Sequence, residues 1–274
     1  MGLSLGNKNI GSIYKGNKSI GKVYLGNKLI FQKSVELVET LYTFTTVGAT
    51  SWTSPLNVVK IDYLVVAGGG AGGRTGRLQY VAGAGGAGGL LQGTINNPIP
   101  DYSYYIVVGA GGNTPVTETR GGAGGNSRFE SIIATGGGGG GGGTYSSTRT
   151  GGNGGSGGGG SRGDAGGTGI SGQGYNGNSS GAGGGAGSAG YSDGTGGDGI
   201  YSNITGVNIL YAKGGNANQK SKGSNGINGR GYGGDGNELG LSTTGGKGGS
   251  GIVVLKVYTN GEPEFSPPLP PEPF

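Results

Sequence analysis

Apolar residues occur along the chain in short runs, which glycine tracts and polar segments separate. The clearest run is IDYLVV at residues 61–66, where β-branched and aromatic residues fill a segment of strand length. Similar short runs occur at residues 41–45, 104–108, 128–133, 207–211 and 252–257. Runs of this length and composition are typical of β-strands. We therefore expect a frame of short strands and no long helix.

The first 34 residues contain a ten-residue repeat. The sequences GNKNI, GNKSI and GNKLI begin at Gly6, Gly16 and Gly26. Because Gly-Asn pairs suit tight turns, the repeat predicts three or four short strands in a small N-terminal β-meander. So few apolar side chains do not stabilise such a module alone. We interpret residues 1–34 as an assembly or docking module, with Tyr14 and Tyr24 as contact candidates. The alternative is a small subdomain that covers one end of the main body.

Residues 35–67 are typical of conventional β-structure that leads into the main domain. Charged residues are sparse here, and the run at 61–66 ends this segment. Trp52 is the one tryptophan of the chain. A large aromatic side chain among predicted strands favours a core position over a ligand platform. We therefore expect Trp52 to be buried.

Glycine supplies 76 of the 274 residues, and most of it lies within residues 68–257. Tracts such as 83–89 and 136–143 hold almost nothing but glycine and alanine. An extended threefold helix of the polyproline II type has no internal hydrogen bonds, and glycine keeps the N–H that proline lacks. Neighbouring tracts can therefore satisfy one another's amides. The expected fold class is all-β plus irregular, with a β-strand frame around a glycine-rich body of packed polyglycine II helices.

Residues 258–274 form a Pro-rich acidic tail. Proline at this density excludes a sheet interior and favours extended structure. We interpret the tail as a strap on a neighbouring surface, with Phe265, Leu269 and Phe274 as anchors. The alternative is a disordered end.

The composition excludes several kinds of chemistry. Without histidine or cysteine there is no Ser-His-Asp triad, no thiol nucleophile and no zinc site of the usual ligands. The sequence GGGAGG at 68–73 matches a dinucleotide-binding motif, but no helical pattern follows and no acid stands about 20 residues on. We expect no enzymatic activity, no cofactor and no metal.

Charge and hydropathy restrict the partners. The net charge is +5, but the N-terminal lysines stand beside predicted turns and no basic helix is present, so we expect no nucleic-acid binding. The sequence contains no run of about 18 apolar residues, so we expect no membrane insertion. No signal-peptide pattern opens the chain, so we expect synthesis in the cytoplasm.

Bulky polar and aromatic residues interrupt the glycine tracts at intervals. Loops rich in Tyr, Ser, Asn and Arg on a rigid scaffold resemble a paratope in composition. The alternative is that these residues only solvate the loop tips. The candidate binding residues are Arg77, Tyr80, Tyr145, Arg149, Tyr175, Tyr191, Tyr201, Arg230 and Tyr232.

The order of several segments resembles the glycine-rich domain of bacteriophage tail-fibre and other virion proteins. The resemblance covers roughly residues 58–257. It is carried by YLVVA at 63–67 before a glycine run, GGAGGL at 85–90, YIVVGAGG at 105–112, NSRF at 126–129, AT at 134–135 and GGSGIVV at 248–254. More loosely, the chain is similar to the receptor-binding adhesins at the fibre tips of T-even-like phages.

The resemblance implies a virion protein that is exposed to the extracellular medium and made in the bacterial host. Its partners would be other virion proteins, or further copies of itself, and a bacterial surface polysaccharide or outer-surface protein. The alternative is a purely structural head fibre or capsid decoration protein. An ice-binding protein on polyglycine helices is a more distant reading.

Overall fold

The computed structural model describes residues 13–15, 18–20, 22–25, 28–32, 36–75, 81–143, 146–217, 223–237 and 245–261. The chain forms two units. Unit 1 consists of residues Met1–Val38 and Thr259–Phe274, and unit 2 consists of residues Glu39–Tyr258.

Unit 1 contains two short antiparallel hairpins. β1 (Ile13–Lys15) pairs with β2 (Lys18–Ile20), and β3 (Lys22–Leu25) pairs with β4 (Lys28–Gln32). Two residues of the Gly-Asn repeat separate the strands within each hairpin. The four short strands agree with the repeat, but they form two separate two-stranded sheets in place of one meander.

Unit 2 contains two four-stranded sheets. The first sheet has the order β5 (Leu37–Phe44), β14 (Ile252–Asn260), β7 (Val58–Val66) and β8 (Leu90–Asn96). The second has the order β11 (Ile132–Ala134), β10 (Ser127–Phe129), β9 (Ser103–Val108) and β6 (Gly48–Thr53). The run at 128–133 is thus a hairpin and not one strand, because Glu130 has a φ of 50° and turns the chain.

A conventional hydrophobic core lies between these two sheets. Ile61 of β7, Leu255 of β14, Ile106 of β9 and Phe129 of β10 belong to it and have no solvent exposure. Trp52 is 8% exposed and packs between Tyr42 and Tyr104, with ring centroids 5.1 and 5.8 Å away. The predicted burial of Trp52 is confirmed.

A small hairpin covers part of the other face of the first sheet. β12 (Ile200–Ser202) pairs with β13 (Ile209–Tyr211), and Tyr211 packs with Leu64 and Val254 in a second buried cluster. β7 and β14 are therefore apolar on both faces where they approach the glycine tracts. This double burial explains their unbroken apolar sequence.

The glycine tracts form a body whose backbone hydrogen bonds repeat every third residue. Each N–H of residues 68–74 donates to a different neighbour from the residue before it, and the neighbour recurs after three residues. The donations are from Gly68, Ala71 and Arg74 to residues 119–125, from Gly69 and Gly72 to residues 246–249, and from Gly70 and Gly73 to residues 83–86. Three residues per turn with bonds only between segments is the pattern of packed polyglycine II helices.

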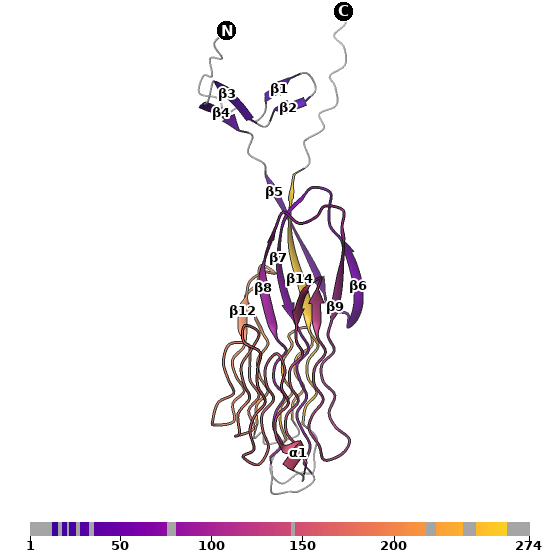
Figure 1. Ribbon diagram of the computed structural model, residues 1–274, viewed down its shortest axis with the longest axis vertical. Helices are drawn as coiled ribbons and strands as arrows, with labels where there is room; N and C mark the ends of the chain where they lie inside the picture. Colours follow the sequence, from indigo (N-terminus) through magenta and orange to yellow (C-terminus); the bar gives the residue numbers. More distant parts are fainter. Residues whose placement is uncertain are drawn as a thin grey trace, which may run out of the picture. The chain divides into compact units, whose positions relative to one another are not determined.

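Two segments lie at the centre of this body. Residues 67–74 and residues 82–89 are each linked by backbone hydrogen bonds to six other segments, and each of the two is one of the other's six. Residues 82–89 repeat the threefold pattern: Ala84 and Ala87 donate to Gly181 and Gly184. Figure 1 shows the segments running side by side beyond the sheets. The buried backbone N–H groups of these segments are satisfied by hydrogen bonds to neighbouring segments in three directions.

The close approach of these segments requires glycine. A Cβ added at Gly85 would lie 2.0 Å from the carbonyl oxygen of Gly70, and one added at Gly70 would lie 2.1 Å from that of Gly138. No side chain fits at such distances. The core of the body is backbone, as the sequence predicts, and alanines such as Ala71 and Ala84 are fully buried in it.

The chain enters and leaves unit 2 on neighbouring strands. Near these points, Lys256 of β14 forms an ion pair with Glu39 of β5, with 2.6 Å between Nζ and Oε2. The helix α1 (Ser146–Arg149), which the sequence does not predict, lies at the end of the glycine body away from the sheets (Figure 1). We call the two ends of unit 2 the sheet end and the loop end.

Candidate functional site

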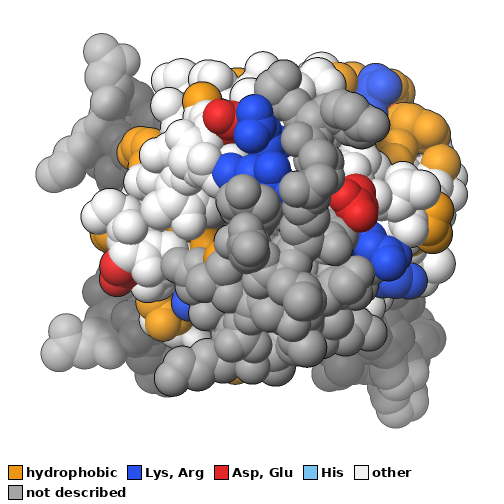
Figure 2. Space-filling model, turned by 90° about the horizontal axis from the view of Figure 1, so that it is seen from below, with side chains coloured by type: hydrophobic (Ala, Val, Ile, Leu, Met, Phe, Trp, Pro, Cys, Tyr) orange, Lys and Arg blue, Asp and Glu red, His pale blue; other side chains and the backbone are white. Residues whose placement is uncertain are grey.

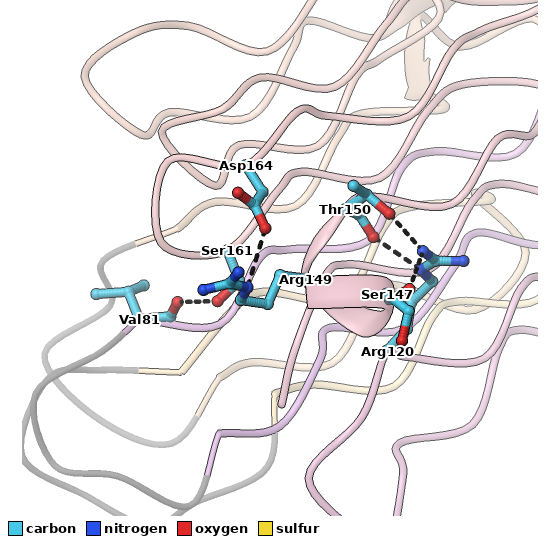
Figure 3. A network of polar contacts seen from close by, with 7 residues as sticks. All are labelled: Val81, Arg120, Ser147, Arg149, Thr150, Ser161 and Asp164. Carbon is cyan, nitrogen blue, oxygen red and sulfur yellow. Dashed lines mark hydrogen bonds and ion pairs between the residues drawn. The ribbon is translucent and has the colours of Figure 1, made fainter. Parts of the chain in front are cut away.

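Arginines tie neighbouring loops together at the loop end. Arg120 donates from Nε to the carbonyl oxygen of Thr150 at 2.7 Å and from Nη2 to the Thr150 hydroxyl at 2.6 Å. Its Nη2 also donates to the carbonyl oxygen of Ser147 in α1 (Figure 3). Arg74 donates in the same way to the carbonyl oxygen of Val116. Arg74 follows one glycine tract and Arg120 precedes another, and this position is the sequence signal that marks both arginines.

The predicted binding residue Arg149 belongs to the same network. Its Nε lies 3.0 Å from Oδ2 of Asp164, and its carbonyl oxygen accepts a hydrogen bond from the N–H of Ser161. The Ser161 hydroxyl donates in turn to Val81 (Figure 3). Arg149 therefore links its own loop to residues 161–164, and Ser161 links these residues to Val81. Figure 2 shows the loop end with basic side chains beside acidic ones.

Several predicted residues fall outside the part of the chain that the structure describes. These are Arg77, Tyr80, Tyr145, Phe265, Leu269 and Phe274. Tyr14 and Tyr24 lie in β1 and β3 of unit 1.

Three predicted residues lie in or beside the hairpin of β12 and β13. Tyr201 lies in β12 and is 62% exposed. Arg230 Nη1 and the Tyr232 hydroxyl both donate to the carbonyl oxygen of Leu210, each at 3.2 Å, so these two side chains fix the hairpin in place. Burial raises the pKa of Tyr232 and outweighs the opposing effect of the nearby Arg230 charge. The structure therefore does not bring these three residues together with Arg149.

Tyr191 closes a turn on the flank of the glycine body. Its hydroxyl donates to Oδ2 of Asp198 at 2.5 Å, and the Ser188 hydroxyl lies within hydrogen-bond distance of both groups. The ring itself is 43% exposed.

Asparagines at the ends of glycine segments bond to the backbone of neighbouring segments. A side-chain oxygen accepts a backbone N–H in each case. The pairs are Asn126 with Gly136, Asn153 with Thr168, Asn176 with Gly169, Asn216 with Gly196, Asn225 with Lys247, Asn228 with Ser250 and Asn237 with Ala82. The sequence pattern associates the asparagines of the loops with ligand binding. In the structure, these seven side-chain oxygen atoms instead accept backbone hydrogen bonds that hold neighbouring segments together.

A shallow pocket of about 480 Å³ lies on the flank beside Tyr175. Residues 171–174, Asn176 and Ile200 of β12 are among the residues that line it. Tyr175 is 52% exposed and is the one predicted binding residue that lines this pocket. Gln173 and Ile200 were not predicted, because their meeting with Tyr175 depends on how the segments pack.

Two carboxylates show how differently the ends of unit 2 treat charge. Burial acts to raise the pKa of Asp62 on β7, but hydrogen bonds from Thr94 and Lys60 outweigh it, and the pKa lies below its usual value. Asp235 lies within the glycine body and accepts the N–H of Asn216 at 2.8 Å. Burial is the dominant influence there and raises the pKa of Asp235.

In the described part of the chain no three acidic side chains gather as metal ligands would, and no helix could cross a membrane.

The comparisons with known proteins identify a family. The family described as "Glycine-rich domain" matches residues 45–258, which is most of the chain. A search of curated proteins finds no significant match. The chain belongs to the glycine-rich domain family.

Proposed function

We propose that this member of the glycine-rich domain family is a bacteriophage virion protein, a tail-fibre or tail-tip adhesin that binds a bacterial surface receptor. Its partners would be other virion proteins and a surface polysaccharide or outer-surface protein. No catalytic step is part of the proposal.

The polarity of unit 2 carries this proposal. β5 and β14 lead the chain into and out of the unit side by side at the sheet end. The loops around Arg120 and Arg149 lie at the opposite end of the glycine body (Figure 1). Attachment at one end leaves the other end free to reach a surface, which is the arrangement that an adhesin needs.

The construction of the loop end supports the same reading. The arginine contacts hold the bases of the loops to one another, and the backbone-packed body beneath them is rigid. A preorganised support lowers the entropic cost of binding through loops. A purely structural spacer would need the body but not the network of linked loops.

Exposed apolar side chains at the sheet end fit the docking role. Leu56 is 79% exposed and Ile99 is 60% exposed. Both lie in loops joined by Ser54, whose hydroxyl donates to the carbonyl oxygen of Ile99 at 2.7 Å. Exposed apolar side chains in two hydrogen-bonded loops are compatible with an interaction surface.

Phage adsorption tests the proposal. Purified full-length protein should compete with phage particles for the host surface, and immunogold labelling should place it on the particles. Replacing residues 144–150 by the corresponding loop of a related phage protein should alter host range. The matched control replaces residues 203–206, which lie in the turn between β12 and β13. Labelled particles with unchanged adsorption and host range would favour the head-fibre or decoration alternative, and unlabelled particles would contradict both.

A further inference from the structure

The pocket beside Tyr175 combines aromatic, apolar and polar lining residues. Besides three glycines, the lining residues are the half-exposed Tyr175, the apolar residues Ile200, Ala186 and Ala189, and the polar residues Ser171, Gln173 and Asn176. Among the residues that the structure describes, no charged one lines the pocket. Its volume of about 480 Å³ falls in the range of small-molecule sites.

The backbone around the pocket is fixed before any ligand arrives. The N–H of Tyr175 donates to the carbonyl oxygen of Gly185, and its carbonyl oxygen accepts from Gly157. The Gln173 side chain accepts from the N–H of Thr135 at 2.7 Å and donates to the carbonyl oxygen of Ile133 at 3.2 Å. The ring of Tyr175 therefore projects from a segment that is held on two sides.

Asn176 lines this pocket, and a backbone hydrogen bond holds its side-chain amide. Its Oδ1 accepts the N–H of Gly169 at 2.9 Å, which fixes the amide plane and turns the NH₂ group the other way. Among the described residues, none accepts a hydrogen bond from that NH₂ group, from the Tyr175 hydroxyl or from the Ser171 hydroxyl. Three polar groups at the pocket are thus available to a ligand.

The geometry points to a neutral saccharide unit as the occupant of this pocket. A pyranose ring has an apolar C–H face that suits a tyrosine ring and a rim of hydroxyls that suits amide and hydroxyl partners. An uncharged lining gives no counter-ion to a phosphate, carboxylate or ammonium group. This inference rests on the proposed function, and it places the sugar contact on the flank of the glycine body and not in the arginine-linked loops.

Ligand-observed and protein-observed NMR on the full chain tests the site. The probes are lactose, maltotriose and chitotriose as neutral saccharides, and a hyaluronan tetrasaccharide as an anionic one. At least one neutral probe should shift the amide resonances of residues 169–176 and 186–189, and the anionic probe should not. If no neutral probe shifts them at millimolar concentration, or if the anionic probe binds there more tightly, the inference is wrong.

Two variants and a control assign the binding to the pocket. Tyr175→Ala removes the exposed ring and should weaken binding about tenfold or more. Asn176→Asp keeps the oxygen that accepts from Gly169 but replaces the donor, and should weaken binding as well. Tyr201→Ala removes a more exposed tyrosine that does not line the pocket, and binding should not change. Equal affinity of all three variants would overturn the assignment.

Adsorption separates this inference from the proposed function. If Tyr175→Ala still blocks phage adsorption as well as the wild type, the adhesin stands and the flank is not its receptor site. If the saccharide binds at the pocket but the protein does not compete with phage, the pocket stands and the adhesin role is wrong.

Discussion

The two ends of unit 2 solve the same packing problem with opposite materials. At the sheet end, side chains such as Ile106 and Phe129 fill the space between two sheets, and the backbone hydrogen bonds of the strands join them to their paired strands. In the glycine body few side chains are present, and residues 68–74 bond in three directions to their neighbours. The first design stabilises by apolar burial and the second by close backbone contact. Glycine costs conformational entropy in ordinary helices and strands. At the positions where two backbones of the glycine body come into contact, such as Gly85, it is nevertheless the residue that fits.

Adding one carbon to the centre of the glycine body should have the largest effect. In Gly85→Ala the new Cβ would meet the carbonyl oxygen of Gly70 at 2.0 Å, and that oxygen already accepts the N–H of Gly234. Overpacking a side-chain core costs about 1–3 kcal/mol, and a rigid backbone yields less, so we expect a loss of more than about 3 kcal/mol in the free energy of unfolding. Urea unfolding measures it.

The control for that substitution is an alanine on the outside of the same body. Ala123 is exposed, and Ala123→Val should change the free energy of unfolding by less than about 0.5 kcal/mol. A Gly85→Ala protein as stable as Ala123→Val would show that the segments are not packed as closely as described.

Removing one carbon from the sheet core should cost less. Ile106 has no solvent exposure, and Ile106→Val should lower the free energy of unfolding by about 0.5–1.5 kcal/mol, since it loses buried methylene contacts and leaves a small cavity. The same urea experiment measures it. An Ile106→Val loss larger than that of Gly85→Ala would reverse the comparison between the two ends.

The smallest effects come from the two carboxylates, and their signs should be opposite. The folded pKa of Asp62 lies below its unfolded value of about 3.9, so its contribution to stability is present above that pH and is lost as the pH falls. The folded pKa of Asp235 lies above about 3.9, so its contribution is present below that pH and is lost as the pH rises through the folded pKa.

Paired asparagine variants test these signs. At pH 7, Asp62→Asn should lower the thermal midpoint, and Asp235→Asn should raise it, because an amide keeps the acceptor for Asn216 without a buried charge. Both differences should shrink toward pH 3. Thermal unfolding followed by circular dichroism across this range measures them, and shifts of the same sign at pH 7 would contradict the assignment.

Much of the fold could be predicted because its signals are local. The strand at 61–66, the burial of Trp52 and the extended glycine tracts all follow from residue type and spacing. The turn at Glu130 and the helix α1 could not be predicted, because Glu130 gives no sequence sign of its positive φ and SSTR is too short for a helical period.

The sequence does not show which glycine segments pack against one another. Glycines carry no side chain to distinguish one tract from another, so the alignment of segments depends on sparse contacts. Examples are Asn237 with Ala82, which are 155 residues apart, and Arg120 with Thr150. The pocket beside Tyr175 arises from this alignment, and therefore lining residues from other segments, such as Ile200, could not be found in advance.

Native-state hydrogen exchange tests the threefold bonding most directly. β6 lies at the edge of its sheet and pairs only with β9, so its protected amides should alternate with exchanging ones. In the glycine body every amide from Gly68 to Gly73 donates to another segment, so all six consecutive amides should be protected. Alternating protection there, or exchange at the rate of an unstructured chain, would contradict a core made of backbone.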